Sequence, residues 1–236
     1  MRPGKRLVDL AIALVVLVAT APLLLLVALL VRRDGGSVLF RQVRVGRYGR
    51  PFSILKIRTM SVDTEHQGLQ ITAAYDRRIT KAGAVLRRTK VDEIPQLWNV
   101  VRGEMSVVGP RPEVQRYVDL YTEQQREVLE YTPGITDPAS LHYIAEEDLL
   151  GQCEDPHAYY VSVVMPDKVE RNLAYARRAT VFSDLWLVAR TALLPLGRLV
   201  GRELPPVLVD PSFVAPSRRP DSSAHLRQTL AHASDS

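Results

Sequence analysis

The sequence predicts an α+β protein that is mostly helical, contains one small β-hairpin, and carries a re-entrant membrane helix near its N-terminus. Three observations lead to this fold class. An uncharged apolar run covers residues 10–31, apolar residues alternate over much of 38–58, and segments of helical periodicity fill most of 79–200. The expected organisation is a membrane segment over 1–36, a folded domain over 37–200 and a disordered tail over 201–236.

Basic residues are concentrated around the apolar run. The first 50 residues hold nine lysines and arginines and two aspartates, whereas the whole chain has a net charge of +5. This surplus indicates an anionic membrane surface or phosphate ligands. A nucleic-acid binder is the weaker alternative, because it predicts basic residues interleaved with aromatic ones on one face. The single cysteine, Cys153, excludes an intrachain disulfide and fits a reducing compartment.

The apolar run has three interpretations. As a helix, residues 10–31 would be about 33 Å long, enough to cross a bilayer. A cleaved signal peptide is disfavoured, because the run continues well past the ATA site and Pro22 would follow the cut. A straight transmembrane helix is disfavoured by Pro22 in mid-run and by basic pairs at 5–6 and 32–33. A bent helix with both ends on the cytoplasmic side satisfies both observations.

The next segment predicts a β-hairpin. Residues 38–45 and 52–57 alternate roughly between apolar and polar residues, and 46–51 have the composition of a turn. Residues 61–76 are polar and irregular and predict a mobile surface loop. Residues 79–88 predict a turn that leads into a helix.

The stretch TKVDEIPQLWNVVRGEMSVVGPRP covers residues 89–112. Pro95 is tolerated only in the first turn of a helix, so we expect a helix over about 92–102 that ends at Gly103. Asp92 and Glu93 would then lie at its N-terminus. Helix capping is the ordinary role of two such carboxylates. They could also attack a phosphorus centre or hold a hard cation.

Helices are expected over most of the remaining chain, at 113–131, 155–165, 168–179 and 182–200. In the last of these, Asp184, Thr191 and Arg198 recur every seven residues on an otherwise apolar helix. Both a buried core helix and an interfacial helix lying in the membrane plane agree with this pattern.

The stretch at 89–112 resembles the signature of the bacterial sugar transferases, the monotopic polyprenyl-phosphate phosphoglycosyltransferases. The matching parts are VDEIPQ, NV, RGEMS and VGPRP, and the match extends over some two dozen positions. RTM at 58–60 and PGIT at 133–136 also match, whereas DPASL at 137–141 departs from the family's commoner form. The resemblance covers about residues 4–200, so it implies that 37–200 form the catalytic domain.

The resemblance also implies roles for individual residues. Asp92 and Glu93 would be catalytic, with Asp92 the nucleophile and Glu93 a ligand of Mg²⁺. The membrane helix would break at Ala21-Pro22. The substrate phosphates or nucleotide would contact Arg58, Thr59, Arg87 and Arg111.

The reaction that the resemblance implies moves a sugar-1-phosphate from a UDP-sugar to a polyprenyl (undecaprenyl) phosphate, which releases UMP and begins the synthesis of a surface glycan or exopolysaccharide. The enzyme would act at the bacterial inner membrane, with its catalytic domain on the cytoplasmic face and no nucleic acid as partner. Direct transfer and a two-step route through an aspartyl phosphosugar both stay open, as does a homo-oligomer. The alternative function is a non-catalytic membrane adaptor, in which Asp92 and Glu93 only cap a helix.

Overall fold

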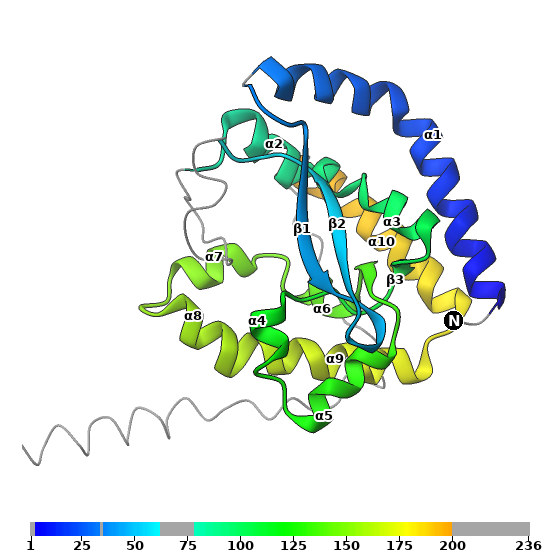
Figure 1. Ribbon diagram of the computed structural model, residues 1–236, viewed down its shortest axis with the longest axis vertical. Helices are drawn as coiled ribbons and strands as arrows, with labels where there is room; N and C mark the ends of the chain where they lie inside the picture. Colours follow the sequence, from blue (N-terminus) through cyan, green and yellow to red (C-terminus); the bar gives the residue numbers. More distant parts are fainter. Residues whose placement is uncertain (1–2, 34, 62–77, 200–236) are drawn as a thin grey trace, which may run out of the picture.

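The structure is a computed structural model that describes residues 3–33, 35–61 and 78–199. Nearly all of the loop expected at 61–76 and the tail expected at 201–236 lie outside the described residues. Figure 1 shows a long N-terminal helix along one edge of a mainly helical body that contains a β-hairpin. The mostly helical α+β class is therefore confirmed.

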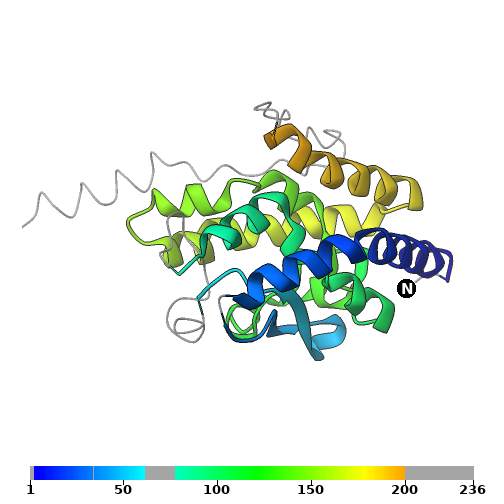
Figure 2. The ribbon, with the colours of Figure 1, turned by 90° about the horizontal axis from the view of Figure 1, so that it is seen from above.

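The N-terminal helix α1 (Pro3–Arg33) is bent. It contains Pro22, and both views show that it changes direction near its middle (Figures 1 and 2). Thr20 Oγ1 donates to the Val16 carbonyl at 2.7 Å, a bond that also favours bending. Large apolar side chains such as Val18 and Leu25 are mostly exposed. The expected bent shape is confirmed, whereas contact with a membrane stays a prediction.

The hairpin pairs β1 (Leu39–Val45) with β2 (Pro51–Ile57) in the antiparallel register Leu39↔Ile57 to Val45↔Pro51. A short 3-10 turn, η1 (Arg47–Gly49), connects the two strands. The hairpin predicted from the alternating pattern is therefore confirmed.

Three short helical segments follow: α2 (Lys81–Thr89), the 3-10 turn η3 (Val91–Glu93) and α3 (Gln96–Arg102). The single helix expected over 92–102 is wrong at its start. Lys90 has a left-handed backbone (φ 59°) that ends α2, and Pro95 stands outside α3 as its N-cap. Because Pro95 has no N–H, the chain forms a separate turn before α3 begins. Gly103 ends α3 as expected, with φ 84°.

Two very short strands, β3 (Ser106–Val108) and β4 (Gly134–Thr136), form a parallel pair that the sequence did not predict. Their approach depends on glycine, because a Cβ on Gly134 would lie 2.1 Å from the Gly109 nitrogen. The single helix expected over 113–131 is wrong, because Thr122 caps a new helix inside it through the Gln125 N–H. The segment instead contains α4 (Gln115–Val118), α5 (Glu123–Arg126) and the 3-10 turn η4 (Glu127–Glu130).

The helices expected at 155–165 and 168–179 are joined in the structure. A π-helical turn, η5 (Tyr160–Val164), lies just before Pro166 and widens the helix where the proline has no N–H to donate. The segments from β4 onward are α6 (Pro138–His142), α7 (Glu146–Gly151), α8 (Pro156–Tyr159), η5 and α9 (Met165–Arg178).

The last helix, α10 (Val181–Leu199), turns its polar line toward the protein. Asp184 accepts a hydrogen bond from the Tyr175 hydroxyl at 2.6 Å, and Thr191 pairs with Thr136 at 2.7 Å. Its apolar side points outward, with Phe182 exposed by 88%. Of the two expectations, the buried core helix is wrong, and the outward apolar side agrees with an interfacial helix.

Polar contacts attach the first turns of α1 to the folded domain. Asp9 is 3% exposed and accepts hydrogen bonds from Ser106 Oγ at 2.7 Å and Val107 N at 3.2 Å. Lys5 pairs with Asp184 of α10 at 2.5 Å. In addition, Arg6 donates to the C-terminal carbonyl groups of α3. These contacts join the start of α1 to β3, α3 and α10.

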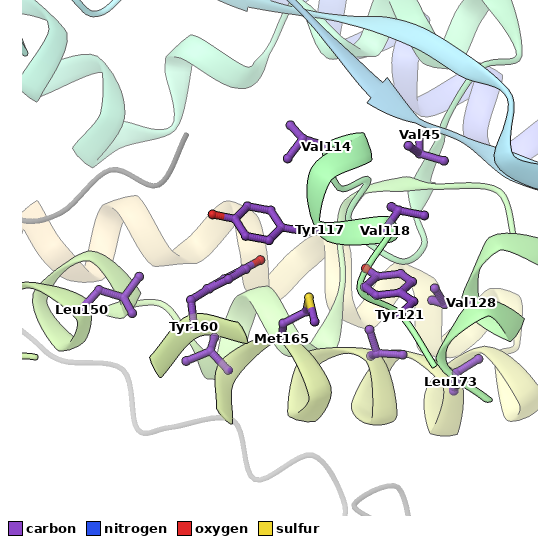
Figure 3. Packing of buried hydrophobic residues seen from close by; sticks show 12 residues of the cluster. Val45, Val114, Tyr117, Val118, Tyr121, Val128, Leu150, Tyr160, Met165 and Leu173 are labelled. Carbon is purple, nitrogen blue, oxygen red and sulfur yellow. The ribbon is translucent and has the colours of Figure 1, made fainter. Parts of the chain in front are cut away.

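Three hydrophobic clusters stabilise the domain. The first lies between α9 and the α4–α5 segment, where Tyr117, Tyr121, Tyr160 and Met165 pack together (Figure 3). The second packs α1 against β2, β3, α3 and α10, and the third packs the end of α1 against β2 and α2. The bent helix is therefore part of two of the three cores.

Candidate active site

Asp92 and Glu93 lie in the turn η3, between the end of α2 and the start of α3. Both side chains are buried, at 5% and 9% exposed. The Oδ1 atom of Asp92 has no hydrogen-bond partner among the described residues. A buried carboxylate oxygen without a partner is costly, so this atom marks a place where a ligand or a reacting group would bind.

Glu93 is held by two cations from distant parts of the chain. Its Oε1 accepts from Lys56 Nζ at 2.9 Å and from Arg111 Nη2 at 2.5 Å, while its Oε2 accepts from Arg111 Nη1 at 3.4 Å. Arg111 comes from the turn after β3, and its Nη1 also donates to the Ile135 carbonyl at 3.4 Å. The two-pronged contact with Arg111 fixes both the position and the plane of the carboxylate.

The two adjacent carboxyl groups have opposite pKa shifts. Burial, and then the charge of Glu93, raises the pKa of Asp92, although Lys56, Lys90 and Arg87 oppose this. Burial alone would also raise the pKa of Glu93, but the positive charges of Arg111, Lys56 and Lys90 outweigh it and hold that pKa well below its usual range. Two neighbouring carboxyl groups whose pKa values are driven apart are suited to different chemical roles.

Lys56 is the site residue that sequence reasoning missed. It lies on β2 between the buried residues Leu55 and Ile57, and burial lowers its pKa despite the attraction of Glu93. Its signal was a lysine within the apolar part of a strand, two residues before Arg58 of the RTM motif. That signal could not show which carboxylate Lys56 would reach.

Arg87 and Thr59 are brought together near the two carboxylates Asp92 and Glu93, which we call the dyad. Arg87 Nε donates to Thr59 Oγ1 at 3.2 Å, and Arg87 Nη1 pairs with the exposed Glu147 of α7 at 3.3 Å. The contact between the two segments is close, because a Cβ on Gly83 would lie 2.0 Å from the Thr59 carbonyl oxygen. Arg87 also acts electrostatically on Asp92, which places it near the dyad.

Arg58 is not brought into this group. Its side chain is buried, and its Nη2 donates to the Val31 carbonyl at 3.0 Å and to the Gly35 carbonyl, so it caps the C-terminal end of α1. These hydrogen bonds give Arg58 a structural role at the end of α1. Binding of the nucleotide by Arg58 stays a prediction. Ala21 and Pro22 lie inside α1, and the membrane break expected there stays a prediction.

Asn99 fixes the dyad relative to the hairpin. Its side chain accepts from Leu55 N at 3.1 Å and donates to the Ser53 carbonyl at 2.8 Å and to Glu104 Oε2 at 2.7 Å. Asn99 is fully buried on α3, and both strand contacts are to β2. The helix that follows the dyad and the strand that carries Lys56 are therefore held in register.

The expected Mg²⁺ fits this site only together with substrate. The described residues contain no group of three or more potential metal-ligating side chains. A carboxylate offers about four lone-pair sites, and Glu93 uses three of them for Lys56 and Arg111. One site on Glu93 and the unpartnered Oδ1 of Asp92 thus stay available. Since Mg²⁺ commonly binds one or two carboxylates together with substrate phosphates and water, this donor set suits it.

Comparison with known proteins identifies the family of this chain. Residues 1–198 match the family described as bacterial sugar transferase. An uncharacterised sugar transferase of Bacillus subtilis (strain 168) is 41% identical over 139 residues, which cover 58% of this chain and 68% of the relative. The family match over 1–198 includes the apolar helix, the hairpin, Asp92 and Glu93, and nearly all of α10.

Two further relatives have named activities. The UDP-glucose:undecaprenyl-phosphate glucose-1-phosphate transferase of Caulobacter vibrioides is 35% identical over 191 residues, 79% of this chain and 67% of the relative. The Escherichia coli (strain K12) protein of the same name is 35% identical over 196 residues, 79% of this chain but only 39% of that longer relative. The family match over most of its length shows that this chain belongs to the bacterial sugar transferase family of enzymes.

Proposed function

We propose that this protein transfers a sugar-1-phosphate from a UDP-sugar to a polyprenyl phosphate. The observation that carries the proposal is the buried Asp92, whose Oδ1 has no partner, beside a Glu93 that two cations hold in place. The named relatives use a UDP-sugar and undecaprenyl phosphate, which supports the same substrate classes for this chain.

In the first step a carboxylate oxygen of Asp92 bonds to the β-phosphorus of the UDP-sugar. The bond from that phosphorus to the bridging oxygen breaks, and its electron pair leaves with UMP. In the second step a phosphate oxygen of the lipid attacks the same phosphorus and displaces the Asp92 carboxylate. The products are the polyprenyl-diphosphate sugar and an enzyme ready for another cycle.

A protein catalyses phosphoryl transfer mainly by positioning the reacting groups and by stabilising the negative charge of the transition state. Burial leaves the Asp92 carboxylate poorly solvated, so it gains more from bonding to phosphorus than a hydrated carboxylate would. Arg111, Lys56 and Arg87 supply positive charge around it. In this mechanism Arg111 and Arg87 contact phosphate oxygens, and Lys56 keeps Glu93 ionised and in place.

Mg²⁺ would be held by Glu93, by Asp92 before its attack, and by the diphosphate, and would neutralise charge on the phosphate oxygens. The protein's own part is to present the carboxylates at fixed positions, which the bonds to Arg111 and Lys56 achieve for Glu93.

The outer surface of the molecule suits a lipid substrate. Among the described residues, α1 is the one helix long and apolar enough to cross a membrane, and only 11% of its apolar window is buried. This low burial separates it from the core helix of a soluble protein. Trp98 of α3 and Phe182 and Trp186 of α10 add exposed aromatic side chains. We propose that these surfaces enter one leaflet of the inner membrane from the cytoplasmic side.

The test is UMP release by the full-length protein in detergent, with Mg²⁺, undecaprenyl phosphate and a panel of UDP-sugars. We expect lipid-dependent release with at least one donor, and loss of about a thousandfold or more in Asp92→Asn, because an amide cannot act as this nucleophile. Asp119→Asn is the matched control, since Asp119 is an exposed carboxylate at the end of α4 that accepts a hydrogen bond from Gln115.

The proposal fails if Asp92→Asn keeps near-normal activity, and a non-catalytic adaptor is favoured if the wild-type protein releases no UMP from any donor. A phosphosugar attached to the protein, trapped by omitting the lipid and lost in Asp92→Asn, supports the two-step route. Release of UMP that strictly requires lipid, with no trapped adduct, supports direct transfer instead.

A further inference from the structure

A cavity lies between α6, α9 and the turn that carries Arg111. Its volume is about 30 Å³. Figure 3 shows part of its wall, where Tyr121, Tyr160 and Met165 converge beneath α4. Its lining residues are Pro110, Arg111, Glu113, Tyr121, Val128, Asp137, Ser140, Tyr160, Met165, Lys168, Val169 and Asn172.

Asn172 is the distinctive residue of this cavity. It lies on α9, is only 6% exposed, and its Oδ1 atom has no hydrogen-bond partner among the described residues. A buried amide oxygen normally has a partner, in the protein, in ordered water or in a ligand. Because Asn172 lines the cavity, a hydrogen-bond donor that enters the cavity would satisfy this oxygen.

The cavity has a polar mouth and a closed floor. Arg111, Ser140 and Lys168 at the mouth are partly exposed, whereas Asn172 and Val169 are buried. Contacts within the protein hold the polar side chains at the mouth: Ser140 donates from its N–H and its hydroxyl to Asp137, and Lys168 pairs with Glu146.

The size of the cavity limits what it can hold. One water needs a cavity volume of about 10–15 Å³. The cavity therefore admits two waters or a substituent of about two or three heavy atoms. A complete hexose is too large. The floor offers the Asn172 acceptor beside apolar carbon from Val169 and Met165, which suits a short carbon stem that ends in an O–H or N–H donor.

Arg111 connects this cavity to the reaction. It contacts Glu93 at 2.5 Å and also lines the cavity. In the proposed reaction the attacked phosphorus carries the sugar through one oxygen atom, so a phosphate held by Arg111 brings the sugar to the same residue. We propose that the cavity receives a small polar substituent of the transferred sugar and that Asn172 determines which sugar is accepted.

This inference rests on the proposed function, and binding measurements test it without turnover. Titration calorimetry on the detergent-solubilised full chain compares UDP with UDP-sugars that differ at single substituents. For Asn172→Leu, which keeps the size but removes the acceptor, we expect unchanged UDP affinity. The affinity for the preferred UDP-sugar should fall about tenfold or more, and the differences among donors should shrink. Glu170→Gln, an exposed change on the same helix, should leave both affinities unchanged.

A second variant covers the case in which Asn172→Leu does not fold. Val169→Leu adds one carbon to the floor and leaves Asn172 in place, and it should weaken binding of the same UDP-sugar but not of UDP. The inference is overturned if UDP and UDP-sugar lose affinity equally, or if neither variant changes sugar selectivity, in which case the cavity holds only ordered water. Wild-type protein that binds a UDP-sugar selectively yet releases no UMP contradicts the proposed reaction alone.

Discussion

Arg111 and Glu93 form the most specific contact in the candidate site, with two guanidinium nitrogens against two carboxylate oxygens at 2.5 and 3.4 Å. The residues are 18 positions apart, on the turns that follow β3 and precede α3. Glu93 raises the pKa of Arg111 far above its usual value, and Arg111 in turn lowers that of Glu93. This pair fixes the carboxylate next to Asp92, so it is the first target for mutation.

Arg111→Lys should reduce kcat/KM for the UDP-sugar by about a hundredfold, because an ammonium group cannot make the two-pronged contact that orients Glu93 and phosphate. Initial rates of UMP release measure the effect. Arg116→Lys, the same change at an exposed arginine of α4, is the control. Near-normal kcat/KM in Arg111→Lys would show that charge alone, without the planar geometry, is sufficient.

Asp92→Asn should stabilise the protein at pH 7. The folded state raises the pKa of Asp92 above 3.8, so keeping it ionised costs stability increasingly as the pH rises through the folded pKa. A neutral amide avoids this cost, which we put at about 1 kcal/mol, or an increase of a few degrees in Tm. Thermal unfolding in detergent measures it, and the difference should shrink as the pH falls toward 3.8. A lower Tm at pH 7 contradicts the account of an unpartnered carboxylate.

Glu93→Gln should have the opposite effect on stability. The folded pKa of Glu93 lies well below 4.5, so its contribution is fully present above pH 4.5 and is lost as the pH falls through the folded pKa. The amide leaves Lys56 and Arg111 without their counter-charge, at a cost of about 2 kcal/mol once the partial exposure of Arg111 is allowed for. Tm at pH 7 should fall, and equal Tm values for the two proteins would contradict the paired arrangement.

Asp9→Ala should loosen α1 from the domain. It removes the acceptor of Ser106 Oγ and of Val107 N in a buried setting, which costs about 2–3 kcal/mol. Limited proteolysis should cut faster near the start of the chain, and Tm should fall. Asp9→Asn, which keeps one acceptor, should show a smaller effect in both measurements. Equal proteolysis of all three proteins would mean that the apolar contacts of α1 suffice.

Gly83→Ala should lower activity through Arg87. The new Cβ would lie 2.0 Å from the Thr59 carbonyl oxygen, so α2 has to move away from Thr59 and carry Arg87 with it. We expect KM for the UDP-sugar to rise about tenfold with a smaller change in kcat, since the loss falls on phosphate binding. Ala84→Gly, at the exposed neighbouring position, tests for a mere loss of helix stability. An unchanged KM in Gly83→Ala would separate Arg87 from donor binding.

Several features followed from the sequence alone. The 22 uncharged residues with Pro22 predicted the bent N-terminal helix, because apolar length and a missing N–H act locally. The alternation at 38–58 predicted the hairpin for a similar reason. The motif at 89–112 predicted the family and named Asp92, Glu93 and Arg111 as candidate site residues, and the structure brings Arg111 into contact with Glu93.

Only the tertiary structure decided how these residues are paired. Lys56 reaches Glu93 across 37 residues, Arg58 is drawn to the end of α1, and Asn172 points into a cavity beside Arg111. Periodicity reports which face of an element is buried, but it carries no information on which distant cation meets which carboxylate. Periodicity also did not show which way α10 faces. Its polar residues Asp184 and Thr191 point inward because they bond to Tyr175 and Thr136 in other elements. Partner choice of this kind arises from packing between elements, and the sequence encodes it only through the whole fold.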